Sequence, residues 1–330
     1  MKMIKGSLLI QPLIEPEGKG SNGLWIPEHK YETRGRIVQS ESAEYPIGAL
    51  VLYSKYDTID IQQDGLLIIK ERMILGVSKD GTFSPRSIIP KNNNVLFKID
   101  NYDTIKLAGK DIWLERRENP GQHASVSGEV IAIPETLSFE RENQYVKRNS
   151  MEWETDISVS VGDKCWVDYQ NVVSALGKDY NVTDSVDDRK SIKDEKGNIY
   201  LFLHYGSLIV SRRGKDVICH NGYMLVQPLK VKPESKVLVM PDSISSKDSK
   251  IWGIVKYAGE PNKEYYNKAW HDDRQIRVGD IVMLEKSWSL YLEYPVHCRF
   301  EDKKMFYKVQ RRGVMCILAD GKVSDFEPEL

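Results

Sequence analysis

Three glycines near the N-terminus have the spacing of a phosphate-binding loop. Gly18, Gly20 and Gly23 lie in the run GKGSNG, which is a literal G-x-G-x-x-G. In a dinucleotide-binding site this run opens a helix whose N-terminal N–H groups meet the pyrophosphate. Here the next residues are Leu24–Pro27 (LWIP), and a bulky apolar run that ends in proline opposes a helix. We therefore interpret the glycines as hinges of a loop and not as a nucleotide site.

The cysteines and histidines do not have the spacing of a metal or catalytic site. The four cysteines are far apart and contain no C-x-x-C pair, and the six histidines contain no H-E-x-x-H. Cys219 and His220 are adjacent, but successive side chains of a strand point to opposite faces, so they make a poor chelating pair. The sequence thus predicts buried cysteines in a reducing compartment, no metal, no cofactor and no enzyme.

The overall composition is that of an ordinary globular protein. The chain has 330 residues, 41% hydrophobic and 29% charged, and this length predicts two or three domains. A net charge of −1 gives no argument for binding to nucleic acid or to a membrane surface. The N-terminal run MKMIKGSLLIQPL has neither the cleavage site of a signal peptide nor the length of a membrane anchor. We expect a cytoplasmic protein or a component of a virion.

Three short basic pairs could contact phosphate. We expect them to be hairpin tips that face solvent, with a phosphate-binding surface as the alternative. They are Arg116-Arg117, Arg212-Arg213 and Arg311-Arg312.

The segments that must position any functional loop recur three times in the same order. Each copy has an opening apolar strand, an apolar triplet, a Gly-x-β-branched segment, a tight turn that leads into a strand, and a closing pair of apolar strands. The opening strands are Ser7–Leu13, Asn94–Asp100 and Tyr223–Leu229, and the Gly-x-β-branched segments begin at Gly35, Gly128 and Gly253. The turns and their strands are Ile47–Tyr53, Val161–Val167 and Val278–Leu284. The closing pairs are Leu66–Val77, Tyr200–Ser211 and Met305–Leu318.

The pattern predicts an all-β chain of three tandem small β-barrel domains. Apolar and polar residues alternate, β-branched and aromatic residues are frequent, and no sustained apolar stripe of helical period is found. The glycine and aspartate of V-G-D predict a turn with positive φ and a capped backbone. The expected domains are 1–78, 94–211 and 216–320, joined by Ser78–Asn94 and Arg212–Asp216. The charged insertions 135–156, 170–196 and 260–277 are expected to be solvated loops, with partner contact or ring-to-ring packing as the alternative.

Taken together, these segments resemble the GroES-type co-chaperonin family. The resemblance is carried by SLLIQPL, GLWIPE, RGRIV and IGALVLY in the first copy, by GEV and VGDKCWV in the second, and by YMLVQPL, VLVMPD and VGDIVML in the third. It implies GroES-like barrels, each with a loop whose apolar triplet docks in a groove of a chaperonin. The positions that match this triplet are Leu24, Trp25 and Ile26 in the first copy and Leu238, Val239 and Met240 in the third. Ile112–Leu114 in the second copy is a poorer match.

Two functions remain open on this basis. The first is a non-enzymatic co-chaperonin, a homo-oligomeric ring or cap whose partner is a chaperonin ring. The second is a structural or scaffolding protein, such as one of a viral particle, whose partners are sister subunits. In the second case the triplet Leu24–Ile26 is a strand in the core of its own barrel.

Overall fold

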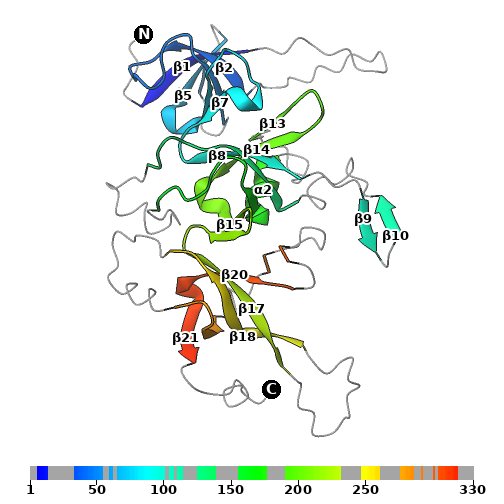
Figure 1. The fold of residues 1–330 in the computed structure, drawn as a ribbon. Coiled ribbons are helices and arrows are strands. Elements are labelled where there is room, and N and C mark those ends of the chain that lie inside the picture. The colour runs from blue at the N-terminus through cyan, green and yellow to red at the C-terminus, as the bar shows by residue number, and fades with distance from the viewer. Residues whose placement is uncertain are drawn as a thin grey trace.

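The computed structural model describes residues 6–13, 33–54, 59–61, 65–100, 104–107, 110–113, 125–138, 155–176, 190–231, 247–260, 276–285, 291–292, 300–301 and 304–318. In this part of the chain the structure is mostly β, with three large antiparallel sheets and a separate two-stranded one. This agrees with the predicted all-β character, apart from one described α-helix. Figure 1 shows the three large sheets following one another from the N-terminal to the C-terminal end of the molecule. We call them units 1, 2 and 3.

Unit 1 is a seven-stranded sheet with the order β4-β5-β1-β2-β3-β6-β7. Its strands are β1 (Ser7–Pro12), β2 (Arg34–Gln39), β3 (Leu50–Tyr53), β4 (Ile59–Ile61), β5 (Leu66–Lys70), β6 (Ile74–Ser78) and β7 (Ile88–Pro90).

Unit 2 is a seven-stranded sheet with the order β13-β14-β8-β11-β12-β15-β16. Its strands are β8 (Asn94–Ile99), β11 (Ser127–Ala132), β12 (Lys164–Val167), β13 (Ser191–Lys193), β14 (Ile199–His204), β15 (Leu208–Arg213) and β16 (Asp216–Cys219). The hairpin of β9 (Thr104–Leu107) and β10 (Lys110–Trp113) connects β8 to β11 and forms the two-stranded sheet.

Unit 3 has five described strands in the order β20-β17-β18-β19-β21. They are β17 (Tyr223–Val231), β18 (Lys247–Ala258), β19 (Ile281–Leu284), β20 (Tyr307–Gln310) and β21 (Val314–Leu318).

The three units share one strand order. In each, the first strand (β1, β8 or β17) lies between the second strand and the strand that precedes a short 3₁₀ helix. The 3₁₀ helices are Glu71–Met73, Tyr205–Ser207 and Arg311–Gly313. The pairing of the first two strands also shifts at the same place in all three units, next to Leu9, Leu96 and Leu225. Within the described residues each sheet is open, since no pairing joins its two edge strands.

The predicted glycine turns are confirmed in all three units. Gly48, Gly162 and Gly279 have φ of 89°, 90° and 100°, a region that favours glycine. Each donates its N–H over 2.8 Å to a carbonyl of the second strand. The carboxylates of Asp163 and Asp280 accept the N–H of the residue three positions earlier, over 2.8 and 2.7 Å, which is the predicted cap.

The Gly-x-β-branched segments have a steric reason. Gly35, Gly128 and Gly253 occupy the same place in the second strand of their units. A Cβ on Gly128 would lie 2.2 Å from the carbonyl oxygen of Lys98, and one on Gly253 would lie 2.8 Å from that of Gln227. Only glycine lets the first and second strands approach this closely.

Each unit has its own apolar core, and neighbouring units share further ones. Val51 and Tyr53 belong to the core of unit 1, and equivalent buried residues fill units 2 and 3. A fourth cluster joins Leu52, Leu75 and Ile88 of unit 1 to residues of unit 2. A fifth joins residues of unit 2 to those of unit 3. The units are therefore packed against one another and not merely linked.

One expected loop is wrong. The insertion 170–196 contains most of an α-helix, α2 (Tyr169–Leu176), and the strand β13. Val172 and Ala175 of this helix are buried in the core of unit 2. The helix is too short to produce a sustained apolar stripe in the sequence, and its packing on the sheet stabilises it.

The sheets also extend into the segments expected to be linkers. Within Ser78–Asn94, β7 pairs with β6, and Ile88 is only 1% exposed. Residues of Arg212–Asp216 form the turn between β15 and β16, and β16 belongs to unit 2. The first two sheets thus continue to Pro90 and Cys219.

Candidate functional site

The predicted docking residues lie outside the described part of the chain. They are Leu24, Trp25, Ile26, Leu238, Val239 and Met240, and the hinge glycines Gly18, Gly20 and Gly23 lie there too. Ile112 and Trp113 are on β10, where the backbone pairs with β9.

The described strands nevertheless show where the connections that contain the three triplets begin and end. Each lies in the connection between the first and second strands, which are antiparallel neighbours in every sheet. In unit 1 the N–H of Leu13 donates to the carbonyl of Arg34 over 3.0 Å, so the two ends of this connection are held together. The triplets therefore occur at equivalent places in the three units.

The described residues contain a second candidate, the joint between successive units. We call Lys91–Asn93 the first joint and His220–Gly222 the second. Asn92 and Asn221 have φ of 54° and 53°, and the amide of each donates to two carbonyls at the 3₁₀ helix of the preceding unit. For Asn221 the acceptors are Tyr205, at 2.8 Å, and Leu208, at 2.9 Å. Both joints thus share one backbone geometry.

The joints differ at their first residue. In the first joint, Lys91 Nζ forms an ion pair of 2.8 Å with Glu44 in the loop before the glycine turn. In the second joint His220 takes the place of Lys91. Ser158 takes the place of Glu44, because Glu44 lies three residues before the exposed Ile47 and Ser158 lies three residues before the exposed Val161. Ser158 Oγ and His220 Nδ1 are 2.7 Å apart.

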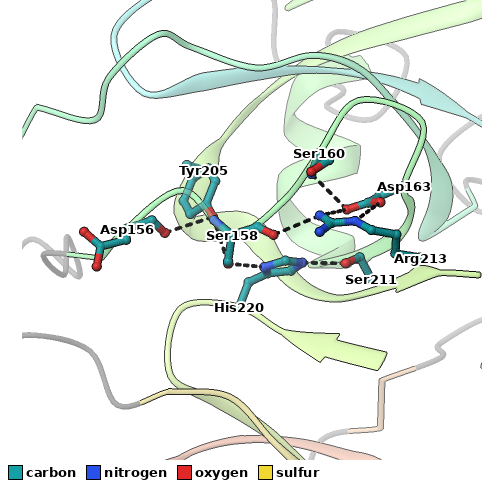
Figure 2. Close-up of polar contacts among 8 residues, drawn as sticks. All are labelled: Asp156, Ser158, Ser160, Asp163, Tyr205, Ser211, Arg213 and His220. Atoms are coloured by element: carbon teal, nitrogen blue, oxygen red, sulfur yellow. Dashed lines mark hydrogen bonds and ion pairs between the residues drawn. The ribbon is translucent and has the colours of Figure 1, made fainter. Parts of the chain in front are cut away.

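His220 is the centre of a polar network, which Figure 2 shows. Its side chain is 1% exposed, and its Nε2 lies 2.9 Å from the hydroxyl of Ser211 on β15. A neutral imidazole donates from one nitrogen and accepts at the other, so two serine hydroxyls satisfy both. The hydroxyl of Tyr205 accepts the Ser158 N–H at 2.8 Å, which fixes the loop that carries this serine.

An ion pair with a buried carboxylate lies beside the histidine (Figure 2). Arg213 donates to both carboxylate oxygens of Asp163, over 2.9 and 2.8 Å, and its Nη2 also donates to the Ser158 carbonyl over 3.2 Å. The carboxylate is 3% exposed and the guanidinium 45%. Such a bidentate pair holds the glycine turn of unit 2 against β15.

Burial sets the protonation states of this network. Desolvation lowers the pKa of His220 from 6.5 to about 4, so the imidazole is neutral at pH 7. Burial by itself raises the pKa of Asp163, but the hydrogen bonds from Arg213 and from the Ser160 N–H outweigh it and leave that pKa below its ordinary value. Burial also raises the pKa of the Cys219 thiol to about 12.

The network has a serine beside a histidine, as nucleophilic hydrolases do. Such a base needs a pKa near the working pH and is oriented by a third group, usually a carboxylate. Here the third group is the Ser211 hydroxyl, and a pKa of about 4 makes His220 a weak base. The geometry favours a structural role, in which Ser158 and His220 hold the loop before the glycine turn of unit 2 against the second joint.

The basic pairs do not all face solvent. The prediction is wrong for Arg311-Arg312, and for Arg212-Arg213 it holds in part, because Arg213 directly precedes the β15–β16 turn and its side chain is 45% exposed. Arg311 is 7% exposed. Arg212 lies over the ring of Phe300 in unit 3, 4.4 Å from its centroid, and donates to the carbonyl of that residue. Arg116-Arg117 lies outside the described residues.

The joints were not predicted from the sequence, because asparagine and glycine, which occur at Lys91–Asn93 and His220–Gly222, are common in any turn. The signal was available in KNNN and HNGY, where an asparagine precedes the opening strand of units 2 and 3. Asparagine tolerates positive φ and carries an amide that can bridge carbonyls.

No family model matches the chain, and no curated protein matches it either. In the described residues no helix is long and apolar enough to cross a membrane.

Proposed function

We propose that the chain is a non-enzymatic co-chaperonin-like protein built from three GroES-like units. The observation that supports this most is the threefold recurrence of one strand order together with one glycine-turn geometry. These are the elements on which the resemblance to GroES-type proteins was based. In this proposal the open sheets belong to small barrels, which span the predicted domains.

The docking role is proposed for the first and third units. Leu24–Ile26 and Leu238–Met240 would enter apolar grooves of a chaperonin ring, while Gly18, Gly20 and Gly23 keep the first loop adaptable. Burial of one leucine, one tryptophan and one isoleucine contributes about 5–8 kcal/mol before the cost of ordering the loop. Several weak loops on one oligomer gain strength by acting together.

A scaffolding function is the second candidate, and the joints favour it. Each joint holds neighbouring units through buried residues and two amide–carbonyl hydrogen bonds, which suits a rigid building block of a particle. In this case the triplets pack inside their own units.

One experiment separates the two functions. The chain is mixed with a group I chaperonin, ATP and a denatured substrate, and co-sedimentation and refolding yield are measured. We expect Trp25→Ala to abolish co-sedimentation while its melting temperature stays unchanged. Trp113→Ala is the matched control, because its triplet is the poorer match. Absence of binding by the unaltered chain, or a loss of about 3–5 kcal/mol of stability in Trp25→Ala, would identify the triplet as core and favour the scaffold.

A further inference from the structure

The far end of unit 3 is exposed where the equivalent surfaces of units 1 and 2 are buried. The second residue after each 3₁₀ helix is Leu75, Ile209 and Met315 in the three units. Their exposed fractions are 6%, 0% and 64%. Leu75 packs on unit 2, and Ile209 packs on unit 3. Met315 has the same place and type of side chain, but within the described residues no further unit covers it.

Two neighbouring positions show the same contrast. Leu52, Trp166 and Met283 are equivalent, because each lies where the third strand shifts its pairing with the strand that follows the 3₁₀ helix. Leu52 and Trp166 are 1% and 5% exposed, whereas Met283 is only half-buried. Val210 is fully buried at the place where Cys316 is exposed. We call Met283, Met315 and Cys316 the end face of unit 3.

The opposite end of the chain carries the matching surface. In unit 2 the residues that receive unit 1 include Leu96, Ile131 and Phe202. By strand pairing their equivalents in unit 1 are Leu9, Val38 and Ile68. Val38 is 38% exposed and Ile68 is half-buried, whereas Leu9 is only 6% exposed, so Val38 and Ile68 supply the exposed part of this surface. We call Leu9, Val38 and Ile68 the start face of unit 1.

We propose that the end face of unit 3 binds the start face of unit 1 in a second copy of this chain. The association is head to tail and repeats the contact that units 1 and 2 make within one chain. A second copy is the occupant that fits, because the contact between units 1 and 2 already buries this pair of surfaces within the chain. In unit 3 the equivalent positions are Leu225, Lys256 and Lys308, so the contact between units 2 and 3 keeps only the leucine of this set. Such a heterologous contact gives a ring if the rotation closes and a filament if it does not. The inference rests on the oligomeric part of the proposed function and not on chaperonin docking.

The test is sedimentation velocity of the full chain over about 1 to 100 µM, a range suited to interfaces of modest affinity. Met315→Asp places a carboxylate in the end face, and Val278→Asp is the matched control, because Val278 is 63% exposed in the same unit but lies on the glycine turn. We expect the unaltered chain and Val278→Asp to associate. Met315→Asp should raise the dissociation constant more than about tenfold, because a buried carboxylate without a partner is costly. Circular dichroism verifies that each variant is folded.

A mixing experiment tests the polarity of the contact. Val38→Asp, like Met315→Asp, should associate with itself more than about tenfold more weakly than the unaltered chain. An equimolar mixture of the two should form a 1:1 complex, since each supplies the face that the other lacks. The inference is overturned if the unaltered chain stays monomeric, as it would if its own C-terminal segment covered the end face. It is also overturned if Met315→Asp behaves as Val278→Asp does, or if Val38→Asp self-associates normally. Chaperonin binding is measured separately, so failure of either proposal is visible alone.

Discussion

The two joints connect successive units with the same backbone and with different chemistry. At the first joint an ion pair joins Lys91 to Glu44, whose side chains are 15% and 54% exposed, and within the described residues neither side chain joins a buried hydrogen-bond network. At the second joint the neutral His220 lies between two serine hydroxyls, next to the ion pair of Asp163 and Arg213, whose side chains are 3% and 45% exposed. An exposed pair contributes little and is screened by salt, whereas a buried network is costly to break. The asparagine at positive φ, with its two amide–carbonyl hydrogen bonds, is common to both joints. The side chains differ, so we expect salt to weaken the first joint and acid to weaken the second.

Substitution of the two joint asparagines tests their shared hydrogen bonds and has the largest expected effect on stability. Asn221→Ala leaves two buried carbonyls without their donors and places alanine at positive φ, so we expect a loss of about 4 kcal/mol of unfolding free energy. Asn92→Ala should cost about 2 kcal/mol, because Asn92 is only half-buried. Chemical denaturation measures both. Asn221→Gly is the control, since it keeps the conformation and loses only the amide; equal stability of this variant and the unaltered chain would contradict the role of the amide.

Removal of Arg213 tests the ion pair beside the second joint, in which the carboxylate is buried. Arg213→Ala leaves the carboxylate of Asp163 buried without its guanidinium, and we expect a loss of about 3 kcal/mol. The double variant Asp163→Asn with Arg213→Ala should recover part of this loss, because no charge is then left buried. Denaturation of the single and double variants measures the coupling, and strictly additive effects would show that the pair does not interact.

Acid should loosen the second joint selectively. The unfolded chain binds a proton at His220 near pH 6.5, and the folded chain does so only near pH 4. Stability from this group is therefore complete above pH 6.5 and falls as the pH drops from 6.5 to about 4, by about 3 kcal/mol in all. Unfolding free energies measured across this range should show the slope, and His220→Gln should flatten it. A slope that persists unchanged in the variant would assign it to other groups.

The exposed pair of the first joint has the smallest expected effect. Lys91→Ala should cost less than about 1 kcal/mol, and the difference should shrink further in about 1 M salt. Thermal melts at low and high salt measure this. A cost as large as that of Arg213→Ala would remove the contrast between the joints.

The sequence predicted the repeating elements well because their causes are local. The glycine turns at Gly162 and Gly279 and the close approach at Gly128 depend on residue types that only one conformation or contact permits. Helix α2 could not be predicted in this way, since its short apolar pattern gains stability only from the core of unit 2. The partners of His220 come from a loop 62 residues earlier and from a neighbouring strand, and no pattern in a single segment indicates such a contact.

The measurement that tests the central proposal most directly is hydrogen exchange of the full chain with and without a group I chaperonin and ATP. We expect residues 24–26 and 238–240 to exchange rapidly in the free chain and to become protected when the chaperonin is added. Residues 112–114, the triplet of the second repeat, should change little. Protection of residues 24–26 already in the free chain, or no change on addition of the chaperonin, would contradict a docking role for these triplets.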